Sequence, residues 1–210
     1  MTRYARTERD AFADELLARG PQAPTLCAGW TTADLAAHVV TRDRRPDAAA
    51  GILVPALSGY TDAVRRRIRD RVDWPGLVAQ VRNPPWWTVA AVPPVDALVN
   101  TVEFFVHHED VRRGRDGWAP RDLPADLERQ LWRAARLLLR RGLRDLPADV
   151  LVDAAGFDQV RTGRGGPHLR LSGTPGELLL FGFGRQASTR VDLTGPPELV
   201  EQARTTAMGV

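Results

Sequence analysis

The 210-residue chain is 43% hydrophobic and 26% charged, which is the composition of a globular protein with a buried core rather than of a disordered one. It has no apolar run of the ~20 residues that a membrane-spanning helix needs, and its first residues are charged where a secretion signal would be apolar. A single cysteine excludes an internal disulfide framework. The sequence therefore predicts a cytoplasmic protein without a membrane partner.

The net charge of +3 raises the question of a nucleic-acid partner. All 29 basic residues are arginine, and 26 acidic residues balance most of their charge. The densest basic run, residues 64–71, is not interleaved with aromatic residues and is followed by no helix-turn-helix pattern. We interpret this run as a solvent-exposed helix face and predict no nucleic-acid partner.

Helical periodicity dominates the first two thirds of the chain. The second predicted helix begins at the capping residues 31–34 and stops near Arg44, because Pro46 disfavours helical geometry in the residue before it. The long helices suit an antiparallel four-helix bundle. The other helices are predicted at residues 2–19, 58–71, 74–81, 93–113 and 124–144.

After Pro147 the pattern changes to short apolar runs around a Gly-rich turn. Thr174-Pro175-Gly176-Glu177 predicts a capping box ahead of an apolar helix. We therefore expect an α+β protein with an N-terminal, DinB-like four-helix bundle over residues 1–146 and a small C-terminal α/β domain over 147–210. The strands and the last helix of that domain are predicted at 150–152, 169–171, 191–193 and 196–207.

The helix predicted over residues 93–113 is largely apolar, unlike a surface helix. Its polar residues recur at steps of three and four and share one stripe, so the stripe should face a polar feature inside the bundle. Buried carboxylates and imidazoles need a partner or a metal ion. Glu103 and His107, one turn apart, suit a zinc-like ion, and a buried Glu–His hydrogen bond is the alternative. The stripe consists of Asp96, Asn100, Glu103, His107 and Asp110.

Three segments resemble motifs of mycothiol-dependent maleylpyruvate isomerases and their DinB-like relatives. Residues 25–38 resemble the family's metal-binding motif, residues 103–110 its second motif, and residues 176–185 its small-domain signature. The resemblance covers nearly the whole chain in the expected order. It implies one divalent metal ion, for which zinc is the first candidate. It also implies a mycothiol-type thiol cofactor that approaches the metal between the two domains. The implied metal ligands are His38, Glu103 and His107.

The resemblance also implies an activity, a metal-dependent, thiol-assisted isomerase or S-transferase that acts on a small molecule. The alternative is a metal-binding sensor or carrier without turnover. Arg185 matches an arginine that counts as functionally important in the family, so we expect it to reach the metal cleft and bind a substrate carboxylate. A helix-end arginine bound to terminal carbonyls is the alternative there. Asn100 is either a substrate contact or a hydrogen-bonding residue of the bundle.

For the other polar residues near these motifs, a structural role is at least as good an interpretation as a functional one. Asp110 either orients a metal ligand or ends its helix. His108 points about 100° away from its neighbour on a helix and is not expected to bind the metal. Cys27 reads as a small buried residue rather than a nucleophile. Arg42 and Arg45 read as solvent-exposed rather than as contacts of an anionic substrate.

Overall fold

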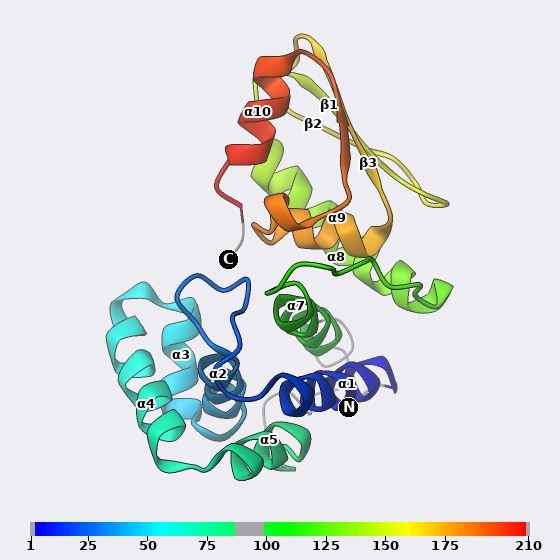
Figure 1. Ribbon diagram of the computed structural model, residues 1–210. Helices are drawn as coiled ribbons and strands as arrows, with labels where there is room; N and C mark the ends of the chain where they lie inside the picture. Colours follow the sequence, from blue (N-terminus) through cyan, green and yellow to red (C-terminus); the bar gives the residue numbers. More distant parts are fainter. Residues whose placement is uncertain (1–2, 87–98, 209–210) are drawn as a thin grey trace. The chain divides into compact units, whose positions relative to one another are not determined.

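The computed structural model describes residues 3–86 and 99–208, and the chain forms two compact units, Met1–Trp118 and Ala119–Val210 (Figure 1). The first unit is helical and the second contains a four-stranded sheet, so the predicted α+β class is confirmed. The division falls after Trp118, whereas the change of periodicity placed a boundary at residues 146–147. The difference arises because helix α8 packs against helix α9 of the second unit.

The first unit is built from helices, most of which follow the predicted segments, whereas α3 and the turn η1 were not predicted. Helix α1 packs against α7, while α2 packs against α4 and α5. The predicted helix start at Pro93–Pro94 and the stripe residue Asp96 lie outside the described residues. The elements are α1 (Arg3–Arg19), α2 (Thr32–Arg44), α3 (Pro46–Leu53), the 3-10 turn η1 (Pro55–Leu57), α4 (Ser58–Arg71), α5 (Trp74–Arg82) and α7 (Thr101–Arg112).

Helix α2 has defined ends. At its start, the Thr31 hydroxyl accepts the N–H of Asp34, and the Asp34 carboxylate accepts the N–H of Thr31, which is the reciprocal capping box. At its end, α2 stops at Arg44 as predicted. Pro46 then opens α3, where its missing N–H would have no helical partner anyway.

The core of the first unit lies between α1, α2, α5 and α7. Phe12, Leu35 and Phe104 are completely buried, and Leu77 of α5 is nearly so. The short α5 therefore supplies more of this core than the longer α4, whose only buried side chains are Val64 and Arg65.

The basic run on α4 is only partly the solvent-exposed face that its composition predicted. Arg65 is buried, pairs with Asp34 and lies over the ring of Trp30, with 4.5 Å to the ring centroid. Arg69 also reaches Asp34, at 2.7 Å. Both arginines therefore tie α4 to the beginning of α2, and the prediction of free exposure is wrong for them.

The second unit combines the helix α8 with a small sheet and the apolar α9. The sheet order is β2-β1-β3-β4, with β1 parallel to β3 and the outer pairs antiparallel. The three-residue strand β2 was not predicted. The elements are α8 (Ala125–Leu143), β1 (Asp149–Ala154), β2 (Val160–Thr162), β3 (His168–Gly173), α9 (Pro175–Gly182), the 3-10 turn η4 (Gln186–Ser188), β4 (Asp192–Thr194) and α10 (Pro197–Thr205).

The start of α9 corrects one local prediction. Thr174 occupies the N-cap position but makes no side-chain cap bond. Glu177 instead accepts the backbone N–H of Arg190 at 2.6 Å. The sequence pattern of a capping box is present, but its acidic residue, Glu177, hydrogen-bonds to a distant segment of the chain. None of the described helices combines the length and hydropathy that crossing a bilayer requires.

Candidate metal centre

Three side chains of α2 and α7 converge in the first unit, as predicted. Oε1 of Glu103 lies 3.8 Å from Nε2 of His38 and 3.7 Å from Nε2 of His107. The two imidazole rings stand edge to face, with their centroids 5.3 Å apart. The structure therefore brings together one residue of α2 and two residues that lie one turn apart on α7.

The donor atoms suit a zinc-like ion. One atom from each of His38, Glu103 and His107 lies within 4.8 Å of the other two. Zinc bonds of about 2.0–2.2 Å at tetrahedral angles separate neighbouring donors by about 3.3–3.6 Å. The observed 3.7 and 3.8 Å differ from this by tenths of an ångström, and both exceed ordinary hydrogen-bond lengths. The three residues therefore have the donor atoms and the spacing that could hold a metal ion.

The local environment sets charge states that favour cation binding. Burial lowers the pKa of His38, although the Glu103 carboxylate opposes that shift. Burial alone would raise the pKa of Glu103, but the Arg42 guanidinium and the two imidazoles hold that pKa well below its usual range. His38 is therefore neutral and Glu103 ionised near pH 7, which are the forms that bind metals.

Arg42 is the residue at this centre that sequence reasoning missed. Its side chain is only 14% exposed, and it forms an ion pair with Oε2 of Glu103. The prediction of solvent exposure is therefore wrong for Arg42. The available signal was its spacing, because it follows His38 by four residues and shares a face of α2. Arg45, in contrast, pairs with Asp47 near the surface.

A buried chain of charges leads from Arg42 to α1. Nη2 of Arg42 lies 2.9 Å from Oδ1 of Asp43, and Nη1 of the fully buried Arg9 lies 2.7 Å from Oδ2 of Asp43. Both guanidinium groups lie over the ring of Phe104, at 5.0 Å and 4.2 Å from its centroid. Arg9, Asp43, Arg42 and Glu103 thus alternate in sign, and their formal charges sum to zero.

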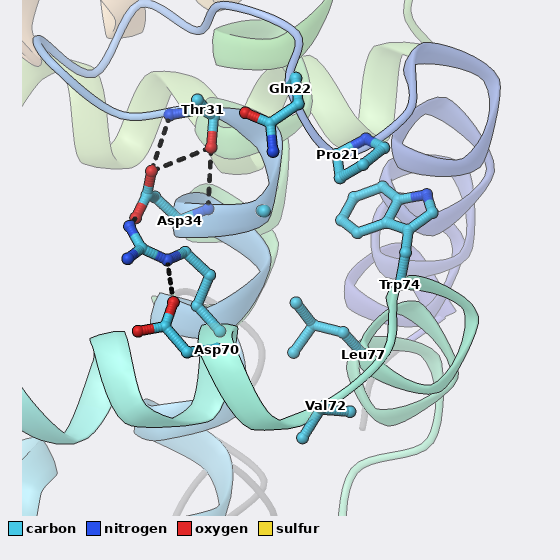
Figure 2. Close-up of a pocket in the computed structure, with 10 residues that line it drawn as sticks. Pro21, Gln22, Thr31, Asp34, Asp70, Val72, Trp74 and Leu77 are labelled. Atoms are coloured by element: carbon cyan, nitrogen blue, oxygen red, sulfur yellow. Dashed lines mark hydrogen bonds and ion pairs between the residues drawn. The ribbon is translucent and has the colours of Figure 1, made fainter.

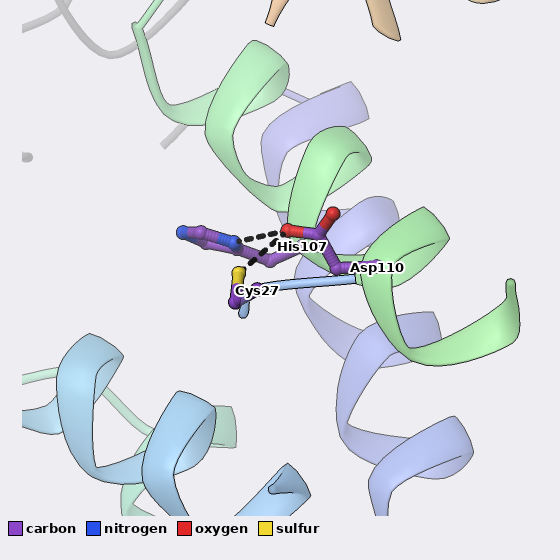
Figure 3. A group of neighbouring side chains, drawn as sticks. All are labelled: Cys27, His107 and Asp110. Carbon is purple, nitrogen blue, oxygen red and sulfur yellow. Dashed lines mark hydrogen bonds and ion pairs between the residues drawn. The ribbon is translucent and has the colours of Figure 1, made fainter. Parts of the chain in front are cut away.

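A second group of side chains meets the other nitrogen of His107 (Figure 3). Nδ1 of His107 lies 3.1 Å from Oδ2 of Asp110, and the Cys27 thiol donates to the same oxygen at 3.3 Å. Asp110 is completely buried, whereas Cys27 is only half-buried. Asp110 therefore has the geometry of a residue that orients a metal ligand, and Cys27 is part of its environment.

The remaining candidate residues fall outside this cluster. His108 lies toward α1, where its Nδ1 is 3.4 Å from Oε2 of Glu8. Asn100 is buried directly before α7. Arg185 follows α9 in the second unit and donates to the carbonyl oxygen of Phe183 at 2.6 Å. The functional roles of Asn100 and Arg185 remain predictions.

An open pocket of about 480 Å³ lies beside the start of α2, but it is lined by none of the three candidate metal ligands (Figure 2). Its polar wall is formed by Asp34 and Arg69, which bind each other, and by Thr31, which caps the helix with Asp34. Trp74 and Leu77 line the opposite side. These polar groups are already satisfied, so the pocket has no set of convergent groups comparable to the histidine cluster.

No protein-family model and no curated relative matches this chain. The crystal structure of a mycothiol-dependent maleylpyruvate isomerase matches it with a TM-score of 0.53 and 17% sequence identity, covering 91% of this chain and 90% of that one. A histidine-to-alanine variant of that isomerase gives the same TM-score and coverage at 15% identity. The chain therefore has the fold of the mycothiol-dependent maleylpyruvate isomerase.

Proposed function

We propose that this protein holds one divalent cation, with zinc as the first candidate, between His38, Glu103 and His107. We further propose that it uses the ion with a mycothiol-type thiol to convert a small electrophilic molecule. The convergence of the three donor side chains carries the proposal. The likeness in fold to a thiol-dependent isomerase supports a thiol as the second component.

A divalent cation here would act as a Lewis acid and favour the thiolate form of a thiol that meets it. Three protein ligands leave a position for such an exchangeable group. The buried chain of charges also favours an anionic ligand on the cation, because Arg42 already neutralises Glu103 and Arg9 neutralises Asp43. The two positive charges of the cation would therefore be uncompensated until an anionic ligand arrives.

The residues of the two units have separate tasks in this proposal. Asp110 fixes the ring of His107, and Arg42 holds Glu103. Asn100 and Arg185 are the candidate substrate contacts. The thiolate sulfur would add to one carbon of an activated double bond, and the π electrons would move onto the conjugated carbonyl. Rotation about the resulting single bond and expulsion of the thiolate re-form the double bond as an isomer, whereas protonation of the carbanion keeps the C–S bond and completes an S-transfer.

Metal analysis of the purified chain tests the centre. We expect one zinc ion per chain in the parent and little zinc in a His38→Ala variant. His168→Ala is the matched control, because His168 is exposed on the sheet of the second unit. A His38→Ala protein that keeps the zinc content of the parent would contradict the proposed centre.

Liquid chromatography coupled to mass spectrometry distinguishes the activities, because an isomer differs from the substrate in retention time and a thiol adduct differs in mass. The zinc-loaded chain is incubated with mycothiol and an activated alkene carboxylate, and the products are compared with a reaction that lacks protein. An isomer of unchanged mass indicates an isomerase, and a product heavier by one thiol indicates an S-transferase. If neither product exceeds the protein-free level, the chain is a metal-binding sensor or carrier instead.

A further inference from the structure

The two oxygens of Glu103 face different partners. Oε1 faces the Nε2 atoms of both His38 and His107, at 3.8 and 3.7 Å. Oε2 is held in an ion pair by Nη1 of Arg42. Only one oxygen of the carboxylate is therefore directed at the space between the imidazoles.

Arg42 is itself held in place. Its Nε and Nη2 both donate to Oδ1 of Asp43, at 3.1 and 2.9 Å, so one edge of the guanidinium is occupied. Arg9 binds the other oxygen of Asp43, and the ring of Phe104 lies against the guanidinium. The remaining nitrogen, Nη1, forms the ion pair with Glu103. A rigid guanidinium suits this task because its donors have a fixed geometry.

We propose that Arg42 is a positioning residue of the metal centre. By holding Oε2, it makes Glu103 a ligand through Oε1 alone and keeps a coordination position open for the exchangeable thiol. A carboxylate without this restraint can turn both oxygens to a cation and occupy the position that the thiol needs. This inference rests on the proposed metal centre and adds a reason for its open position.

Cobalt substitution tests the inference through the coordination number. Cobalt(II) has strong visible absorption bands when it has four ligands and weaker bands when it has five or six. The metal-free parent, Arg42→Leu and Arg45→Leu are each loaded with cobalt, and their visible spectra are recorded per bound ion. Arg45→Leu is the control because Arg45 lies on the same stretch of chain and pairs with Asp47 instead.

We expect the bands to weaken in Arg42→Leu and to stay at the parent intensity in Arg45→Leu. Equal spectra in the parent and Arg42→Leu would overturn the inference while leaving the metal centre intact. A parent that takes up no cobalt or zinc would overturn the metal centre and the inference together.

X-ray absorption of the zinc-loaded parent gives a second test that does not depend on the variant folding. The distance from zinc to the carboxylate carbon differs between a ligand that uses one oxygen and one that uses two. One-oxygen binding in the parent supports the role of Arg42. Two-oxygen binding overturns it, because Oε2 would then belong to the ion rather than to the guanidinium.

Discussion

Nδ1 of His107 lies 3.1 Å from Oδ2 of Asp110, on the edge of the imidazole ring away from the Nε2 that faces Glu103. A carboxylate can only accept a hydrogen bond, so the ring N–H that Asp110 binds is on Nδ1, and the Nε2 atom faces Glu103. Carboxylates commonly orient histidine ligands of metals in this way. The hydrogen bond therefore fixes both the ring and its tautomer.

The variant Asp110→Asn tests this relationship. The amide can present its N–H₂ group to Nδ1, which favours the opposite tautomer with the proton on Nε2. We expect zinc affinity to fall about 10–100-fold, the usual effect of losing such a partner. Competition with a chromophoric chelator measures the affinity. Cys27→Ser is the control, since its hydroxyl can still donate to Asp110, and parent affinity in Asp110→Asn would contradict the orienting role.

The variant Arg9→Met tests the buried charge chain as a source of stability. Asp43 is 2% exposed, and removing Arg9 takes away one of its two cationic partners. We expect the free energy of unfolding to fall by about 3 kcal/mol, the lower end of the range for a broken buried pair, because Arg42 remains. Urea denaturation of the metal-free protein measures the change.

The control for Arg9→Met is Arg6→Met on the same helix. Arg6 pairs with Asp10 one turn away, with more than half of its side chain exposed. Such pairs contribute about 0.3–0.5 kcal/mol. If the two variants lose similar amounts, the buried pair does not stabilise the fold beyond an ordinary surface contact.

The variant Asp34→Asn tests a pH dependence at the beginning of α2. Burial would raise the pKa of Asp34, but hydrogen bonds from Thr31, Arg65 and Arg69 lower it to about 2. In the unfolded chain the pKa of an aspartate is about 3.9. Because the pKa of Asp34 is lower in the folded protein, its carboxylate stabilises the fold at pH values above about 3.9, and this stabilisation is lost as the pH falls toward 2. Asparagine keeps the capping ability, so the substitution removes mainly the charge.

We expect Asp34→Asn to cost about 2 kcal/mol at pH 7 and progressively less below about pH 4. Urea denaturation at pH 7 and pH 3.5 measures this change. The control is Asp70→Asn, because Asp70 also pairs with Arg69 but is more exposed than Asp34. This variant should change the free energy of unfolding by less than about 0.5 kcal/mol at both pH values. A cost for Asp34→Asn that is independent of pH would show that the carboxylate charge is not responsible.

Local signals in the sequence were sufficient for much of the helical unit. The bounds of α4, Ser58–Arg71, match the prediction, and α2 has the predicted cap and end. Glu103 and His107 were proposed as metal ligands from their i, i+4 spacing on an apolar helix, and His38 from the resemblance of residues 25–38 to a metal-binding motif; the structure brings the three side chains together. Features encoded by periodicity, caps and proline are readable without tertiary information.

Features that depend on packing between distant segments were not readable. The burial of Arg42 and Arg65 follows from acidic partners on other helices, and sequence spacing cannot show that these partners are near. The helix predicted over residues 124–144 corresponds to α8, but its sequence did not identify α9 as its partner. The strand β2 is three residues long, which is too short for alternation to be recognised.

The variant Arg185→Met tests the predicted substrate contact in the second unit. Arg185 follows Gly184, whose φ of +83° ends α9, and it donates to the carbonyl oxygen of Phe183. This bond matches the helix-end alternative, so the two roles must be separated by experiment. If Arg185 also binds a substrate carboxylate, its loss removes charge-assisted hydrogen bonds that contribute about 1.5–3 kcal/mol.

We expect Arg185→Met to keep the zinc content of the parent and to bind a small dicarboxylate such as maleate at least about 10-fold more weakly. Calorimetry with the zinc-loaded chain measures the affinity, and Arg190→Met is the control in the same segment. Arg185→Lys should also bind weakly, because an ammonium cannot reproduce two parallel hydrogen bonds. If Arg185→Met instead lowers thermal stability while maleate binding is unchanged, the arginine has a structural role at the end of α9, where it donates to the Phe183 carbonyl.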